Sequence, residues 1–133
     1  MKGFLYIMSN PAYKGLLKIG QTGKDPEERR RELTTGIPDE FVIEYYAFVE
    51  DYLKLELEIH QKLNNSRYRQ DREFFEISVQ EAISTIRKIA GERIESEKDF
   101  SKQKSVSNSS RNKLIEILLV GLLFGGVLVN CSG

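Results

Sequence analysis

The chain has 133 residues, of which 40% are hydrophobic and 30% charged; this supports one modest core and excludes a multidomain enzyme. Its 20 basic and 20 acidic residues cancel, so total charge points to neither a nucleic-acid nor a membrane partner. The single cysteine, Cys131, excludes an intramolecular disulfide, and the single histidine, His60, excludes a multi-histidine metal centre. A bound metal would therefore have mainly oxygen ligands.

The charge is unevenly distributed and divides the chain into three segments. Residues 1–95 have the mixed composition of a globular domain and a net charge of −2. Residues 96–113 are polar, serine-rich and carry +3, and we interpret them as a linker. Residues 114–133 contain one charged side chain, Glu116, among mostly apolar ones, which predicts an apolar C-terminal helix.

Within residues 1–95, the first predicted elements are a β-hairpin and a helix. Residues 4–8 and 16–19 are short apolar runs that a turn-forming segment separates. Asp25 is then a helix N-cap, with Pro26 at the first helical position and Glu28 completing a capping box. Gly36 ends this helix after Leu33.

The second half of this segment predicts two helices and two strands. Residues 41–49 are rich in aromatic and branched side chains and predict a buried strand, and residues 74–77 predict a short one. Ser78 and Glu81 form a capping box before the last helix. The apolar stripes of the two helices are Tyr52, Leu55, Ile59 and Leu63, then Val79, Ala82, Ile83, Ile86, Ala90 and Ile94. The predicted order is β-β-α-β-α-(β)-α.

Five motifs, taken together in order and spacing, resemble the GIY-YIG nuclease superfamily. They lie in GFLYIMSNPAYKGLLKIGQTGKDPEERRREL, LELEIHQKL and REFFEI. The sequence is most similar to the branch named for a bacteriophage T-five open-reading-frame DNA-binding domain, related to a meiotically up-regulated fungal family. The resemblance covers about residues 3 to 90 and implies an α+β fold, a small antiparallel sheet flanked by helices. Active members hydrolyse a DNA phosphodiester with one divalent metal.

The resemblance assigns the first tyrosine of the superfamily to Tyr6, and Lys18 replaces the second, as is usual in this branch. A lysine ammonium suits a phosphate clamp or, if its pKa is lowered, a base. Gly20, two residues on, fits a strand end that lets a nucleic-acid backbone approach closely.

Arg29 matches the superfamily arginine, whose guanidinium can bind a phosphate through two hydrogen bonds. Arg30 and Arg31 follow at ~100° steps around the helix, so the three cannot all face one ligand. Glu73 matches the metal-binding glutamate, which implies Mg²⁺ or Mn²⁺ completed by water and substrate phosphate. The alternative for each residue is a solvated surface charge, paired in the case of Glu73 with a neighbouring arginine.

His60 and Glu56 lie four residues apart on one helix flank, so the carboxylate can orient the imidazole or raise its pKa. Two interpretations of His60 stay open: a hydrogen bond to a catalytic water or phosphate, or a structural histidine beside the core. Tyr13 is a weaker candidate for stacking or phosphate contact.

Lysines around the second predicted strand suggest a local basic face despite the net charge of −2. These side chains are Lys14, Lys18 and Lys24, to which the helix adds Arg29 and Arg30 as candidate DNA contacts.

The apolar tail is borderline for a membrane span. Residues 117–133 carry no charge and as a helix would extend ~25 Å, slightly less than the ~30 Å hydrocarbon core. Basic residues precede the tail, as expected for a cytoplasmic N-terminal domain, and the N-terminal apolar run is too short for a signal peptide. We expect a single-pass anchor at residues 114–133; the alternatives are a core helix or a docked tail in a cytoplasmic protein.

The leading hypothesis is a membrane-tethered DNA-binding domain that acts as a metal-dependent endonuclease. In it Glu73 holds the metal, Arg29 and Lys18 bind the phosphate, and Tyr6, helped by His60, positions or deprotonates the attacking water. The alternatives are a non-catalytic DNA-binding module and a membrane-tethered protein-interaction domain of the same fold. The sequence predicts no particular oligomeric state.

Overall fold

The computed structural model describes residues 1–69 and 72–102. In this part of the chain the secondary structure consists of strands, α-helices and two short 3-10 helices. In chain order the elements are β1 (Lys2–Ser9), β2 (Leu17–Thr22), α1 (Pro26–Thr34), β3 (Val42–Glu50), α2 (Tyr52–Lys62), η1 (Asn64–Ser66), β4 (Phe74–Phe75), α3 (Val79–Ala90), η2 (Gly91–Arg93) and β5 (Ile94–Asp99).

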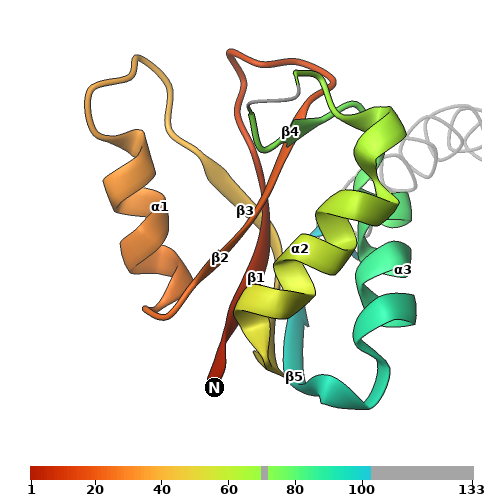
Figure 1. The fold of residues 1–133 in the computed structure, drawn as a ribbon. Coiled ribbons are helices and arrows are strands. Elements are labelled where there is room, and N and C mark those ends of the chain that lie inside the picture. Colours follow the sequence, from red (N-terminus) through yellow and green to blue (C-terminus); the bar gives the residue numbers. More distant parts are fainter. Residues whose placement is uncertain (70–71, 103–133) are drawn as a thin grey trace, which may run out of the picture. The chain divides into compact units, whose positions relative to one another are not determined.

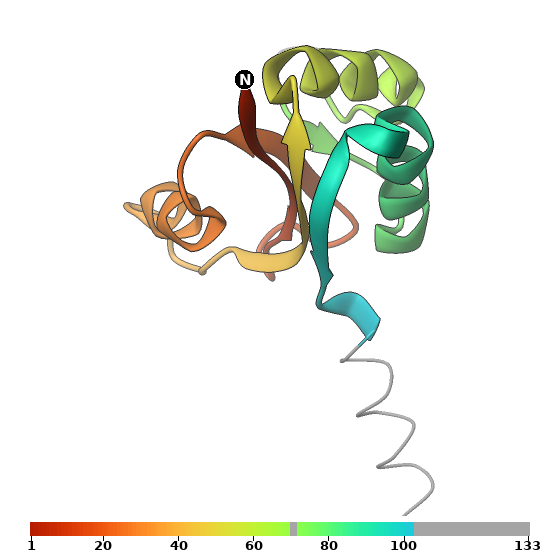
Figure 2. The ribbon, with the colours of Figure 1, turned by 90° about the horizontal axis from the view of Figure 1, so that it is seen from below.

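The strands form one antiparallel sheet in the order β4-β2-β1-β3-β5, which confirms the predicted α+β class. Strand β1 is central because its side chains are apolar on both faces, and residues 5–8 are all buried. The helices lie on both faces of this sheet: α1 on one side, and α2 with α3 on the other (Figures 1 and 2).

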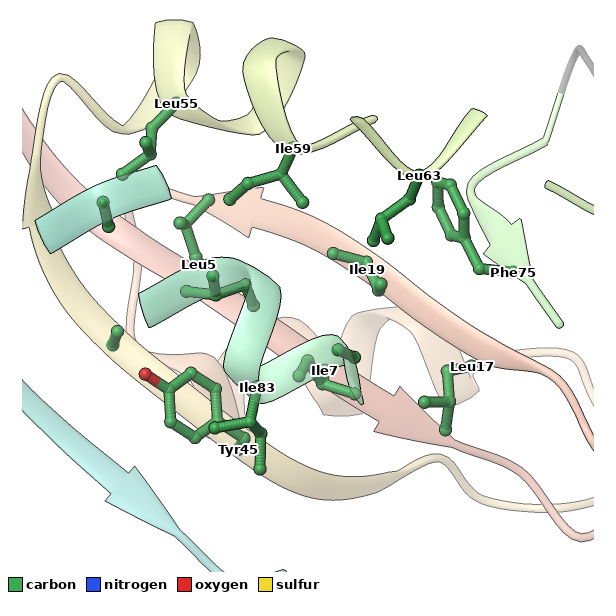
Figure 3. Close-up of a cluster of buried hydrophobic side chains, with 14 of the residues drawn as sticks. Leu5, Ile7, Leu17, Ile19, Tyr45, Leu55, Ile59, Leu63, Phe75 and Ile83 are labelled. Carbon is green, nitrogen blue, oxygen red and sulfur yellow. The ribbon is translucent and has the colours of Figure 1, made fainter. Parts of the chain in front are cut away.

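Each face of the sheet has its own apolar cluster, because successive side chains of a strand point to opposite faces. Leu5 and Ile7 join the larger cluster, which packs against α2 and α3 (Figure 3). Tyr6 and Met8 belong to a smaller cluster that Leu33 of α1 also contacts. The face toward α1 therefore carries Tyr6, the first candidate site residue.

The helix starts agree with the predicted caps. The Asp25 carboxylate accepts a hydrogen bond from the backbone N–H of Glu27 at 2.9 Å, one residue earlier than a capping box with Glu28 requires. The Ser78 hydroxyl accepts from the N–H of Glu81 at 3.1 Å, as predicted. These caps satisfy backbone donors that have no partner within the helix.

The compact unit extends past the predicted end of the domain at residue 95. The sequence predicts Ile94 in the last helix and a linker from residue 96, but α3 ends at Ala90 and the chain returns along β3 as β5. The polar composition of this segment reflects an edge strand whose central side chains face solvent. The compact unit accordingly extends from Met1 to Phe100.

The residues predicted to form a membrane anchor lie outside the part of the chain that the structure describes. None of the helices within residues 1–69 and 72–102 has the length and apolar composition that a bilayer span needs. The linker beyond residue 102 and the tail at residues 114–133 fall outside the described residues. The anchor therefore stays a prediction from sequence.

Candidate functional site

Tyr6 and Gly20 lie opposite each other on β1 and β2, on the face of the sheet toward α1. A Cβ atom on Gly20 would be 2.5 Å from the Tyr6 hydroxyl oxygen and 2.7 Å from its Cζ. The tyrosine ring, which is only 1% exposed, thus fills the space over the glycine. Gly20 makes room for this ring, which is a packing role that the sequence did not predict; the close approach of a nucleic-acid backbone at Gly20 stays a prediction.

The guanidinium of Arg29 on α1 interacts with the Tyr6 hydroxyl and favours the ionised form of the phenol. Burial raises the pKa of Tyr6 above its ordinary value of 10.0, and the Arg29 charge only partly opposes this effect. The phenol therefore stays protonated at neutral pH. Of the two roles expected for Tyr6, this geometry supports orienting a water or phosphate rather than removing a proton from water.

Lys18 and Glu73 form an ion pair beside this tyrosine. The Lys18 ammonium lies 3.2 Å from Oε2 of Glu73 and 5.3 Å from the centre of the Phe74 ring. Pairing of β2 with β4 puts Lys18 opposite Phe74, and the Ile19 N–H donates to the Glu73 carbonyl at 3.1 Å, so the backbone fixes the ion pair. The Lys18 side chain is 13% exposed and that of Glu73 43%, so the carboxylate is open to solvent.

His60 has a structural role in this arrangement. Its Nε2 lies 2.8 Å from the carbonyl oxygen of Ile19, and because a carbonyl only accepts, this nitrogen carries the proton. The ring also packs against Phe75, 5.1 Å between ring centres, on the α2 side of the sheet, whereas Tyr6 faces α1. Burial lowers the His60 pKa, opposite to the effect expected from Glu56. The structural interpretation is the one these contacts favour.

Glu56 contacts the same strand edge one helical turn earlier. Its carboxyl group interacts with the backbone of Gln21 on β2, which favours the ionised form. Burial and the negative charge of Glu73 raise the pKa of Glu56 to about 7, while Lys18 acts in the opposite direction. His60 thus satisfies a backbone carbonyl along the edge of β2 that the two-residue strand β4 does not cover, and Glu56 lies near the same edge.

The predicted basic face is more dispersed than the sequence suggests. Lys14 lies in the loop before β2, and Lys24 lies after that strand, where its ammonium is 2.7 Å from Glu32. The same glutamate accepts a hydrogen bond from Arg29 at 3.2 Å. Arg30 pairs instead with Glu27, with its Nε 2.9 Å from the carboxylate. Among the candidate cations, Lys18 and Arg29 are the two that the structure brings to the tyrosine and Glu73.

Sequence reasoning gave little weight to one neighbouring segment, the run Arg67-Tyr68-Arg69 and Arg72 before Glu73. One hollow of the surface is lined by Tyr68, Arg69 and Arg72 together with Tyr13 and Phe74. The sequence feature that could have identified this segment is its alternation of aromatic and basic residues, because that pattern is typical of nucleic-acid contacts.

The comparison with known proteins concerns the whole folded unit that contains these residues. No curated protein and no solved structure matches the chain. A family model described as the T5orf172 domain matches residues 3–90, which include every residue of the cluster described above. The chain therefore belongs to the T5orf172 domain family, a branch of the GIY-YIG superfamily.

Proposed function

We propose that the chain binds DNA at Tyr6, Lys18, Arg29 and Glu73 and hydrolyses a phosphodiester bond there with a divalent cation. The observation that carries this proposal is the convergence of four motif residues from four segments. Tyr6 contacts Arg29, Lys18 contacts Glu73, and the charge of Glu73 acts on Tyr6. Membership of the T5orf172 family supports DNA as the ligand.

Each side chain has a role that its environment allows. The Arg29 guanidinium and the Lys18 ammonium neutralise the phosphate and the charge that builds on it during attack by water. The protonated Tyr6 hydroxyl, held by Arg29, orients the water or a phosphate oxygen. These groups come from β1, β2 and α1 rather than from mobile loop tips, so they are positioned before DNA binds.

Glu73 fits a hard cation with few protein ligands. Its carboxylate is 43% exposed, and in the described part of the chain no group of three or more acidic, histidine or cysteine side chains forms a closed metal site. Mg²⁺ accepts one or two carboxylates when waters and substrate phosphate complete its coordination. A bound Mg²⁺ or Mn²⁺ would neutralise phosphate charge and polarise the phosphorus–oxygen bond.

A second candidate function, a DNA-binding module without catalysis, is favoured by the Lys18–Glu73 ion pair. The ammonium lies 3.2 Å from the carboxylate and already neutralises its charge. A divalent cation must therefore bind beside a positive charge, which weakens its affinity. In this function Lys18 and Arg29 still bind phosphate, and Glu73 serves only to position Lys18.

The deciding experiment incubates the full chain with supercoiled plasmid DNA and Mg²⁺ or Mn²⁺. Nicking by the wild type that Glu73→Gln abolishes and Glu81→Gln retains supports the nuclease; Glu81 is an exposed acid in the first turn of α3. Binding without nicking supports the module, and Lys18→Met should then lower the slope of log affinity against log salt by about 1. The absence of salt-sensitive DNA binding contradicts both functions.

We further propose, from sequence alone, that residues 114–133 anchor the chain in a membrane with the domain on the cytoplasmic side. The support is the uncharged stretch at 117–133 and the basic residues that precede it. Such an anchor would restrict the domain to DNA that comes close to the membrane.

A further inference from the structure

Two adjoining hollows lie beside Lys18 and Glu73, and the proposed phosphate site uses neither. They have volumes of about 240 and 680 Å³ and share four lining residues, Tyr13, Leu16, Tyr68 and Arg69. We define the aromatic patch as the side chains that give these hollows their rings and positive charge: Tyr13, Lys14, Tyr68, Arg69, Arg72 and Phe74.

The two tyrosines of the aromatic patch are unusually open to solvent for large rings. Tyr13 is 40% exposed and Tyr68 is 53% exposed. Their backbones are nevertheless fixed, since the N–H of Tyr13 donates to the Asn10 carbonyl at 2.9 Å and the N–H of Tyr68 to the Phe74 carbonyl at 2.8 Å. The free-energy cost of ordering the backbone is therefore small when a ligand stacks on these rings.

Phe74 connects the aromatic patch to the phosphate site. The edge of Tyr13 packs against Phe74, with ring centres 5.4 Å apart, and Lys18 lies over the same ring at 5.3 Å. On the other side, the Arg69 guanidinium lies 6.0 Å from the centre of the Tyr68 ring. A strand whose phosphate contacts Lys18 can thus continue across the patch.

The positive charge of the aromatic patch indicates which kind of partner it binds. Lys14, Arg69 and Arg72 line the hollows against one acid, Glu76, although residues 1–95 as a whole carry −2. Rings that stack on bases, combined with cations that neutralise phosphates, are the usual surface for single-stranded nucleic acid. A continuous duplex offers the phosphates but keeps its base faces stacked inside the helix.

We propose that the aromatic patch binds unpaired nucleotides of a DNA strand, so that the chain prefers DNA with a single-stranded region over continuous duplex. Bases stack on Tyr13 and Tyr68, and Lys14, Arg69 and Arg72 contact the adjoining phosphates. This inference rests on the proposed function, because it gives the substrate class of the same site. It requires no catalysis, since it concerns binding alone.

The test measures binding of the full chain, in EDTA, to three fluorescently labelled DNAs: an oligo-dT strand, a blunt duplex, and a duplex with an oligo-dT overhang. The overhang and the strand should bind more tightly than the blunt duplex. Replacing both rings, Tyr13→Ala with Tyr68→Ala, should weaken strand binding by about 5- to 150-fold per stacked base and leave duplex binding nearly unchanged. Tyr13→Phe with Tyr68→Phe should retain the preference, because the rings remain.

Leu57→Ala is the matched control, since Leu57 is 61% exposed on α2 outside the aromatic patch. Circular dichroism of each variant shows whether it is folded. Quenching of 2-aminopurine in the overhang reports stacking directly and should disappear in the double alanine variant.

Four results overturn the inference. Equal affinity for strand and blunt duplex, or unchanged strand binding in the folded double alanine variant, refutes it while leaving the proposed function intact. When an oligo-U RNA strand is measured beside the oligo-dT strand, tighter binding to the RNA refutes the assignment to DNA. No binding to any of the DNAs refutes both this inference and the proposed function.

Discussion

Gly20→Ala tests the arrangement of Tyr6 directly, because the added methyl group would enter the space of the tyrosine ring. The new Cβ would lie 2.5 Å from the hydroxyl oxygen and 2.7 Å from Cζ, closer than real Cβ atoms approach such neighbours. The ring is rigid and 1% exposed, so it cannot swing into solvent without disturbing the core. Overpacking of this kind typically costs about 1–3 kcal/mol.

The substitution also changes the backbone entropy of folding, and this smaller effect opposes the cost of overpacking. Alanine loses less backbone entropy than glycine on folding, which recovers roughly 0.5–1 kcal/mol in a strand. We therefore expect Gly20→Ala to lower the free energy of unfolding by about 1 kcal/mol, the difference between the midpoints of the two effects. For a domain of this size the melting temperature should fall by about 4–8 °C per kcal/mol.

Urea denaturation followed by circular dichroism measures this loss, and a double-mutant cycle identifies its cause. Tyr6→Phe removes the nearest atom, the hydroxyl oxygen, but leaves Cζ 2.7 Å away. Gly20→Ala should therefore cost less in the Tyr6→Phe background than in the wild type, though still more than zero. If Gly20→Ala is as stable as the wild type, or if its cost is the same in both backgrounds, the proposed packing of Tyr6 over Gly20 is refuted.

Three further predictions follow from the charges and from the tail. Because the folded pKa of Glu56 is raised to about 7 from 4.5, its ionisation destabilises the fold as pH rises between these values, so Glu56→Gln should gain stability relative to wild type between pH 5 and 8. The gain should be on the order of 1 kcal/mol in urea denaturation with EDTA, and a difference that does not change with pH contradicts it. Arg29→Ala should weaken DNA binding in fluorescence anisotropy and Arg30→Ala should not, because Arg29 interacts with Tyr6 whereas Arg30 is paired with Glu27; equal losses contradict the assignment of Arg29. In cell fractionation the full chain should stay in the membrane pellet at high salt and a chain ending at Phe100 should not, so a wholly soluble full chain refutes the anchor.

The helices and the inner strands were predictable because their signals are local. The cap residues Asp25 and Ser78 precede their helices by one position, and the buried stripe of α3 repeats with helical spacing. Central strands β1 and β3 are continuous apolar and aromatic runs, since helices or clusters cover both of their faces. These patterns follow from burial, and the sequence carries them without any long-range information.

Strand β5 lacked such a signal. Every residue of β5 between its two ends is exposed, so the strand has no alternation of apolar residues that could predict it. Long-range polar contacts hold it instead: Glu97 accepts hydrogen bonds from Arg87 at 3.1 and 2.9 Å and from Tyr45, and Lys2 lies 2.6 Å from Glu95. Their partners are distant in sequence, so only the fold reveals them. The same charges keep this exposed edge from pairing with other strands.

The candidate site was predictable in its residue types but not in its contacts. Motif order gave Tyr6, Lys18, Arg29 and Glu73, and these four do gather near one another. Which of two faces a side chain occupies depends on strand register, and a single sequence does not contain that information. This is why the expected cooperation of Tyr6 with His60 does not agree with their positions on opposite sides of the sheet.

The edge of β2 explains why a Glu and a His spaced four residues apart occur on α2. The short strand β4 pairs with Leu17 and Lys18 only, so the backbone beyond it lacks a neighbouring strand. One helical turn separates Glu56 from His60, and this spacing brings the carboxyl group near Gln21 while the imidazole donates to Ile19. Two side chains thus take the place of a strand at the edge. They also link α2 to β2, the strand that carries Lys18 and Gly20, although none of the proposed phosphate-binding residues comes from that helix.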